Sequence, residues 1–198
     1  LKLKETTDYP WDGNVTLTIQ DAPEHPLSLK LRIPSWASKA AIRINDKDLE
    51  LAPVSGRYAE VSRVWQQGDV LELRLEMQTR LLAGHPRSEH IRNQVAVQRG
   101  PVVYCLESND VKGDVAFEQI AIDAGAEFEP EYRRGQLGGV TVLKTTAKVM
   151  TSPQRTIIGQ YVDITERVST PVAVELIPYY AWNNRVEPKM SVWLPLIR

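Results

Sequence analysis

The sequence predicts an all-β chain made of two consecutive antiparallel β-sandwich domains. Apolar residues recur at every second position over short stretches, and turn-forming Gly, Asn, Asp and Pro residues separate these stretches. No long amphipathic helical pattern interrupts them. The alternation gives each strand one apolar face and one charged face, as in an antiparallel sheet with one side in water. Short strands with regularly spaced turns are typical of β-sandwiches.

Four stretches in the first part of the chain carry this alternation. The expected strands cover residues 15–19, 27–33, 40–44 and 70–77. The third of them places Ile42 and Ile44 on one face and Arg43 on the other. Turn signals such as Asn45-Asp46 and Gln67-Gly68-Asp69 lie between the strands and predict where they end.

The alternation lapses over residues 82–93, which are polar and rich in turn formers. We place the domain boundary within this stretch, so that the two domains cover residues 1–84 and 85–198. The strands expected in the second domain cover residues 95–106, 115–122, 139–149, 172–177 and 190–194. The charged, Gly-containing residues 127–138 are expected to form an exposed loop.

Composition and charge exclude several classes of protein. The chain has 24 Lys and Arg residues against 25 Asp and Glu residues, without a long block of either sign. It therefore lacks the basic stripe of a nucleic-acid-binding protein. No apolar run approaches the length of a membrane-spanning helix, and no signal peptide is recognisable. The chain begins Leu1-Lys2-Leu3 without an initiator Met, so we expect it to be part of a longer polypeptide.

The single cysteine, Cys105, is the sharpest chemical candidate. In an extended strand Cys105 and Glu107 share one face, with Cα atoms about 6.6 Å apart, which would suit a nucleophile and an acid/base partner. A catalytic thiol needs a cation, a metal or a helix N-terminus to lower its pKa, and the neighbouring sequence offers none. We therefore interpret Cys105 as a buried core thiol and Glu107 as a solvent-facing residue at the strand end.

Metal ligands and paired carboxylates are not evident in the sequence. His25, His85 and His90 fall in expected loops, and no H-E-x-x-H motif is present, so we interpret them as solvated. A lone cysteine allows neither an internal disulfide nor a Cys-rich zinc site. The acidic residues supply no facing pair of the kind that glycosidases use. No catalytic residue, metal or cofactor is expected in this chain.

Aromatic residues gather near the end of the chain, in Pro178-Tyr-Tyr-Ala-Trp-Asn-Asn-Arg185. Trp and Tyr rings can stack on sugar rings, while Asn and Arg side chains can hydrogen-bond hydroxyl groups. The candidate substrate-binding residues are therefore Tyr179, Tyr180, Trp182, Asn183 and Arg185. The alternative is that these rings cap the end of a sandwich or pack at a domain interface.

Five motifs occur in a fixed order and together resemble the C-terminal portion of glycoside hydrolase family 127, the β-L-arabinofuranosidase-like enzymes of bacteria. They span nearly the whole chain. The motifs are Tyr9-Pro-Trp-Asp-Gly13, Leu31-Arg-Ile-Pro-Ser-Trp-Ala37, Val64-Trp-Gln-Gln-Gly-Asp69, Gln98-Arg-Gly-Pro-Val-Val-Tyr-Cys-Leu-Glu107, and Pro178-Tyr-Tyr-Ala-Trp-Asn-Asn-Arg185 followed by Met190-Ser-Val-Trp-Leu-Pro195.

The resemblance implies an upstream (α/α)6 barrel that carries the chemistry, followed by two β-sandwich domains. It also implies a retaining mechanism in which a zinc-bound cysteine thiolate is the nucleophile and a glutamate is the acid/base. The zinc ligands include two cysteines adjacent in sequence. This chain has no Cys-Cys pair, so zinc is expected in the upstream domain and no catalytic residue is carried over. The first sandwich is further expected to be incomplete at its N-terminal side, with an exposed strand edge.

The leading hypothesis is that the chain is the non-catalytic C-terminal β-sandwich region of such an enzyme. Its expected partners are the upstream (α/α)6 barrel, a second copy in a homodimer and a plant-derived carbohydrate, but neither nucleic acid nor a membrane. A targeting signal would lie upstream, so the bacterial cytoplasm and periplasm both stay open. One alternative is a carbohydrate-binding module that uses exposed Tyr and Trp residues. Another is a small independent enzyme that uses Cys105 and Glu107.

Overall fold

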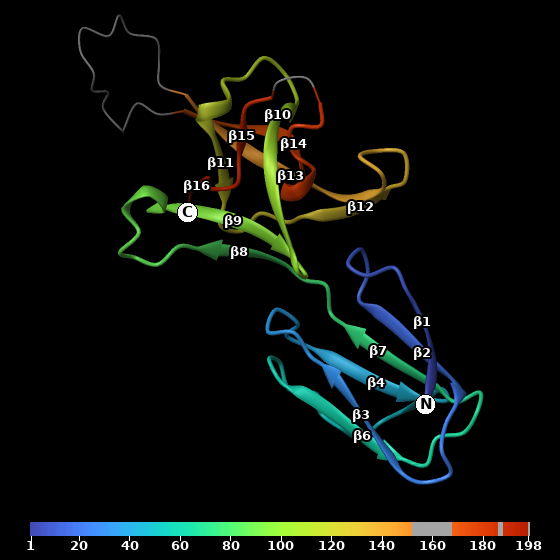
Figure 1. Ribbon diagram of the computed structural model, residues 1–198. Helices are drawn as coiled ribbons and strands as arrows, with labels where there is room; N and C mark the ends of the chain where they lie inside the picture. Colours follow the sequence, from blue (N-terminus) through green and yellow to red (C-terminus); the bar gives the residue numbers. More distant parts are fainter. Residues whose placement is uncertain (152–167, 186–187, 198) are drawn as a thin grey trace, which may run out of the picture. The chain divides into compact units, whose positions relative to one another are not determined.

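The computed structural model describes residues 1–151, 168–185 and 188–197 (Figure 1). It divides into two compact units, Leu1–Gln78 and Thr79–Arg198, which we call the N-terminal and C-terminal units. The sequence led us to place the boundary after residue 84. The structure divides earlier because strand β8 (Thr79–Ala83) pairs along its length with β9 (Gln94–Arg99) of the C-terminal unit. The all-β prediction is confirmed, since the only helices of the described residues are short 3-10 turns.

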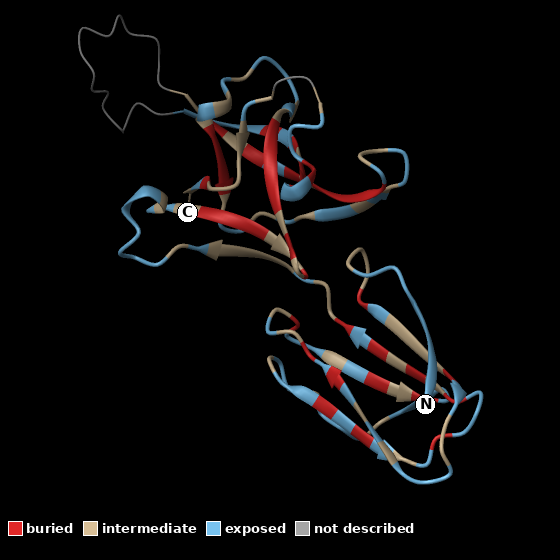
Figure 2. Cartoon of the chain, in the orientation of Figure 1, coloured by how far each residue is buried: buried red, intermediate tan, exposed pale blue. Residues whose placement is uncertain are grey.

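The N-terminal unit consists of two antiparallel sheets that share one core. Five strands form a sheet in the order β1-β2-β7-β4-β5, and two strands form the sheet β3-β6. Their bounds are β1 Lys2–Thr7, β2 Asn14–Asp21, β3 Leu27–Arg32, β4 Ala40–Ile44, β5 Lys47–Asp48, β6 Tyr58–Arg63 and β7 Val70–Leu75. Buried and more exposed positions alternate along β7, as the sequence pattern predicts, and also along β6, which the sequence analysis did not predict (Figure 2).

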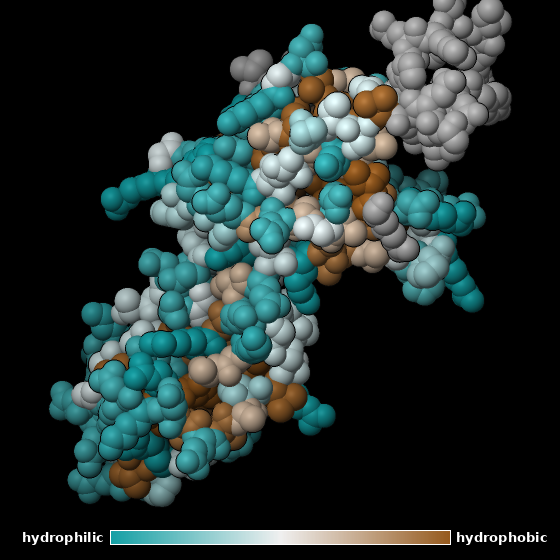
Figure 3. All heavy atoms as spheres, turned by 180° about the vertical axis from the view of Figure 1, so that it is seen from behind, coloured by the Kyte–Doolittle hydropathy of each residue, from teal (hydrophilic) through white to brown (hydrophobic). Residues whose placement is uncertain are grey.

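The two sheets of the N-terminal unit are unequal in size. Every residue of β1 is exposed. This includes Leu3, although it pairs across the strands with the buried Ile19 of β2. Hydrophobic side chains reach the surface of this unit among hydrophilic ones (Figure 3). The incompleteness expected at the N-terminal side stays a prediction.

The described residues of the C-terminal unit form one nine-stranded sheet in the order β15-β10-β14-β13-β11-β16-β9-β8, with β12 paired to β13. Because β10 pairs with β14 on one side and also with β9, the path β10-β14-β13-β11-β16-β9 closes on itself. Only β11 and β16 pair in parallel among the described strands. The remaining bounds are β10 Val102–Val111, β11 Ile120–Asp123, β12 Glu129–Arg133, β13 Val140–Thr151, β14 Val168–Pro178, β15 Met190–Ser191 and β16 Leu194–Ile197.

Four expectations for the C-terminal unit need correction. The strand expected over residues 115–122 begins only at Ile120, after the 3-10 turn η2 (Phe117–Gln119), and the strand expected over residues 190–194 is divided into β15 and β16. The strand expected over residues 95–106 is divided into β9 and β10, because Gly100 adopts a φ of 55° and turns the chain at Gly100-Pro101. The loop expected over residues 127–138 contains β12, which pairs only with β13 among the described strands. Its exposed and half-buried residues give no apolar alternation, so the sequence pattern does not reveal it.

The core of the C-terminal unit lies inside the closed path of strands. Alternate residues of β10, such as Tyr104 and Leu106, point into it together with Leu143 of β13 and Leu176 of β14. The intervening residues of these strands face the other side of the sheet, which carries the site described next. No helix of the described residues is long and apolar enough to cross a membrane.

Candidate functional site

The candidate site lies where the chain passes over strand β10. Strand β14 pairs with one edge of β10, and β15 pairs with the other edge. After β14 the chain therefore crosses β10 to reach β15, and residues 178–185 begin this crossing. We call residues 178–185 the crossing segment. It begins with the 3-10 turn η4 (Tyr179–Ala181), which lies against β10. Two side chains of β10 on this face, those of Cys105 and Glu107, are fully buried.

Cys105 is one of the buried side chains. It is 0% exposed and pairs across the strands with Ile177, but it lies on the opposite face of β10 from the core residues Tyr104 and Leu106. Burial raises the pKa of the Cys105 thiol to about 12, and the nearby carboxylates act in the same direction. The guanidinium of Arg185 lowers this pKa, but by less. The structure thus agrees with a buried, unreactive thiol and places it beneath the crossing segment.

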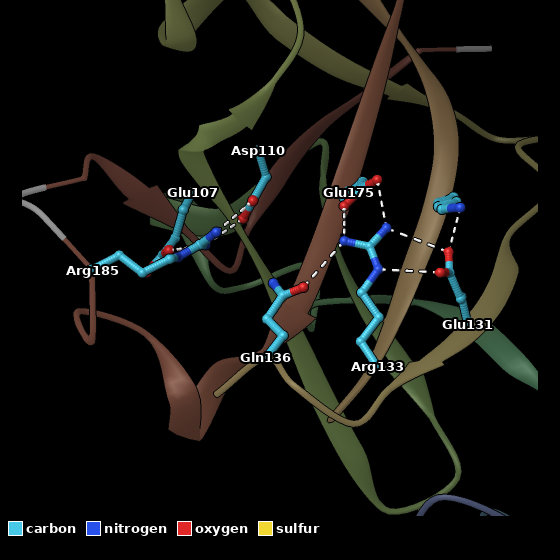
Figure 4. Close-up of polar contacts among 8 residues, drawn as sticks. Glu107, Asp110, Glu131, Arg133, Gln136, Glu175 and Arg185 are labelled. Carbon is cyan, nitrogen blue, oxygen red and sulfur yellow. Dashed lines mark hydrogen bonds and ion pairs between the residues drawn. The ribbon is translucent and has the colours of Figure 1, made fainter. Parts of the chain in front are cut away.

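Glu107 is also buried, which corrects the expectation that it faces water. Its exposed fraction is 0%, because the crossing segment covers the end of β10 and supplies two partners. The backbone N–H of Asn183 donates to Glu107 Oε1 over 2.9 Å, and Arg185 Nη2 donates to Glu107 Oε2. Arg185 also binds both oxygens of Asp110, with Nη1 donating to Oδ1 over 2.6 Å (Figure 4). We call Glu107, Asp110 and Arg185 the ion cluster.

A bulge in β10 brings the two carboxylates together. Residues three apart in a regular strand point to opposite faces, so Glu107 and Asp110 would ordinarily not share a partner. The pairing with β14 advances from Leu106 to Val111 on β10 while it moves only from Leu176 to Val174 on β14. The extra residues change the phase of the strand, so that both carboxylates reach one guanidinium.

The three aromatic side chains of the crossing segment are exposed. Tyr179 is 43% exposed, Tyr180 63% and Trp182 38%, and we call these three residues the aromatic face. Ala181 is the buried residue of η4, and the turn contacts β10. Asn183 is exposed and has a left-handed backbone, with a φ of 60°.

Arg185 differs from the other candidate substrate-binding residues in its placement. Its side chain is 26% exposed, and both terminal guanidinium nitrogens donate hydrogen bonds to carboxylates, Nη1 to Asp110 and Nη2 to Asp110 and Glu107. The structure therefore brings Tyr179, Tyr180, Trp182 and Asn183 to the surface, whereas Arg185 turns back to the strand.

A second charged network occupies the same face of the sheet, farther along toward β12. Arg133 donates to both oxygens of Glu175 over 2.7 and 2.9 Å, and also to Glu131 and Gln136 (Figure 4). These hydrogen bonds raise the pKa of the Arg133 guanidinium above its ordinary value. The adjacent Tyr132 is 54% exposed, and its phenol adds to the effect of burial in raising the pKa of Tyr180.

The described residues do not fit a zinc centre. They contain no group of three His, Cys, Asp or Glu side chains able to hold a metal ion. The three histidines are exposed, and the only cysteine is buried with a raised pKa. Zinc binding by thiolates needs deprotonated sulfur, which this environment opposes.

Comparison with known families assigns both units. Residues 1–77 match the family described as the GH127 middle domain of β-L-arabinofuranosidase, and residues 79–195 match the glycoside hydrolase family 127 C-terminal domain. The chain is 32% identical over 203 aligned positions to a non-reducing end β-L-arabinofuranosidase of Bifidobacterium longum subsp. longum. That match covers 98% of this chain but only 30% of the relative.

Solved structures give the same assignment. One described as a glycoside hydrolase has a TM-score of 0.91 and 39% identity, and the match covers 99% of this chain and 32% of that one. A GH127 β-L-arabinofuranosidase from Geobacillus stearothermophilus T6 has a TM-score of 0.86 and 34% identity, over 98% of this chain and 30% of that one. The chain thus spans about a third of the length of these relatives. It belongs to glycoside hydrolase family 127, with its two units corresponding to the middle and C-terminal domains of that family.

Proposed function

We propose that this chain is the non-catalytic β-sandwich region of a β-L-arabinofuranosidase-like enzyme and that it supports an upstream (α/α)6 catalytic barrel. The observation that carries the proposal is the chemistry of Cys105, the only cysteine of the sequence, which is buried with a pKa of about 12. A thiol in that state is not a nucleophile at neutral pH. The proposal is also supported by the share of the relatives that the chain spans, about 30%.

In this proposal the reacting groups belong to the barrel. Zinc, a thiolate nucleophile and a glutamate acid/base would be supplied there, and zinc would keep the cysteine deprotonated. The homodimer expected from the resemblance stays a prediction.

The isolated chain is expected to hydrolyse β-L-arabinofuranosides no faster than background, because it offers no competent nucleophile. The measurement is release of the aglycone from an aryl β-L-arabinofuranoside, with and without added zinc. Cys105→Ala serves as the matched variant and should give the same background rate. Turnover that disappears in Cys105→Ala would show that this thiol is catalytic and would overturn the proposal.

The exposure of the aromatic face favours a second candidate function, binding of plant-derived carbohydrate. Tyr179, Tyr180 and Trp182 lie on one short segment with their rings partly in solvent, although large aromatic side chains usually contribute to cores. Such rings can stack on the apolar faces of sugars, and the exposed amide of Asn183 can hydrogen-bond hydroxyl groups.

Trp182→Ala is expected to weaken binding of arabinan-derived oligosaccharides about tenfold, the equivalent of roughly 1.4 kcal/mol of lost ring contact. The measurement is isothermal titration of the whole chain with each oligosaccharide. Tyr58→Ala is the control, because Tyr58 is 63% exposed but belongs to the N-terminal unit. Equal affinities for the two variants would argue against the aromatic face as the sugar site.

A further inference from the structure

We propose that the ion cluster holds the crossing segment so that the aromatic face points outward, which makes Arg185 and Glu107 positioning residues and not sugar ligands. The proposal rests on the carbohydrate-binding function proposed above and assigns Arg185 a role different from the one the sequence suggests. It explains why three charged side chains are gathered at a largely buried position beneath three exposed rings.

The ion cluster ties the segment to the strand at two positions. The Asn183 backbone N–H is held by Glu107, and two residues later the Arg185 side chain is held by Glu107 and Asp110. By contrast, the backbone N–H of Trp182 donates to Tyr179 O, and the side-chain amide of Asn184 donates to Ala181 O and Trp182 O, so these hydrogen bonds stay inside the segment. The hydrogen bonds described here between residues 183–185 and β10 are therefore those of the ion cluster and of the Asn183 N–H to Glu107.

Charged groups suit positioning better than they suit stability. Burying carboxylates and a guanidinium costs desolvation free energy, and apolar replacements of similar volume often stabilise a protein as well or better. A guanidinium bound to both oxygens of one carboxylate, however, has its plane and direction fixed. The contact of Arg185 with Asp110 is of this kind. An apolar contact at the same place would allow the segment to slide or rotate.

The backbone of the segment also needs this restraint. Asn183 has a φ of 60°, a left-handed conformation that L-residues other than glycine adopt uncommonly. Its N–H donates a hydrogen bond to Glu107 Oε1, so the carboxylate stabilises the turn that follows Trp182. Release of this contact would free the turn, and the orientation of the Trp182 ring would change with it.

The test removes the charges without leaving any buried charge unpaired. The triple variant Glu107→Gln/Asp110→Asn/Arg185→Met is compared with the wild-type chain and with Arg43→Met/Glu72→Gln, which neutralises a half-buried ion pair in the N-terminal unit. Hydrogen exchange of the Asn183 amide and the indole N–H resonance of Trp182, assigned by its loss in Trp182→Phe, report the segment. Titration with arabinan-derived oligosaccharides reports binding.

We expect the triple variant to exchange the Asn183 amide about 100-fold faster, to shift the Trp182 resonance toward its unfolded position and to bind sugar about tenfold more weakly. The control should match the wild-type chain. Arg185→Lys keeps the charge but not the two-point contact, so it should be intermediate; it also gives the readouts if the triple variant does not fold.

Wild-type exchange and an unshifted resonance in the triple variant would overturn the positioning role. An Arg185→Lys chain equal to wild type would overturn the two-point contact as the source of the restraint, because a point charge would then suffice. A wild-type chain that binds none of the sugars would end the proposed carbohydrate function, and the exchange and resonance results would still decide whether the ion cluster positions the segment.

Discussion

Arg185→Met alone is expected to lower the free energy of unfolding of the C-terminal unit by about 3–5 kcal/mol. The substitution leaves Glu107 and Asp110 side by side beneath the crossing segment without a cation, and Glu107 is 0% exposed. A buried charge that has lost its partner pays the full cost of desolvation. The measurement is denaturant unfolding followed by hydrogen exchange, which assigns the transition to one unit.

The triple variant provides the control for this expectation. Because Glu107→Gln/Asp110→Asn/Arg185→Met removes all three charges, it should recover most of the stability that Arg185→Met loses. A loss below about 1 kcal/mol for Arg185→Met would mean that water reaches the carboxylates and that the cluster behaves as a surface ion pair. An equally unstable triple variant would instead assign the loss to packing of the Arg185 side chain.

Gly13→Ala is expected to destabilise the N-terminal unit by about 3 kcal/mol or more. A Cβ atom added at Gly13 would lie 1.9 Å from the backbone oxygen of Leu75 and 3.1 Å from the Met77 side chain. The Leu75 oxygen cannot move away from the added Cβ without disturbing β7, because Leu75 pairs with Ala40 and its N–H donates to Gly13 O over 2.9 Å. Thermal unfolding with hydrogen exchange measures the loss in this unit.

Gly135→Ala is the matched control for that substitution. A Cβ at Gly135 meets nothing within 4 Å, and its φ is not in the left-handed region. The change should therefore alter stability by no more than about 1 kcal/mol, and a small gain is expected because the unfolded chain becomes less flexible. A loss of stability in Gly13→Ala as small as that in Gly135→Ala would show that the backbone around Gly13 moves easily to accommodate the added Cβ atom.

Sequence periodicity predicted the strands that have one buried face. Residues 40–44 and 70–77 alternate clearly, and they form β4 and β7 at almost the expected bounds. The missed strands β1 and β12 have no buried face, whereas β6 was missed because only two buried apolar residues, Ala59 and Val61, alternate along it. All residues of β1 are exposed, and β12 has no buried position, so neither could show an apolar alternation. Edge strands are defined by hydrogen bonding to one neighbour, which leaves no mark in side-chain polarity.

The candidate site was predictable only in part. The aromatic residues near Trp182 stand out in the sequence because Tyr and Trp are concentrated there, and their exposure agrees with an interaction surface. The ion cluster could not be predicted, since Arg185 lies 75 residues from Asp110 and 78 from Glu107. The shared face of Cys105 and Glu107 was predicted correctly. What covers that face depends on the crossing from β14 to β15, which no local pattern encodes.

The closed path of strands in the C-terminal unit determines where that unit is vulnerable to association. Every strand of the closed path, which we call the ring, has both edges hydrogen-bonded to neighbours for at least part of its length. The ring therefore offers no fully unpaired strand edge to which a strand of another chain could hydrogen-bond. The described strands that leave the ring with one neighbour are β8, β12 and β15. They are short, and β12 carries Glu129, Glu131 and Arg133. Edges of this length and charge discourage the runaway pairing that leads to amyloid.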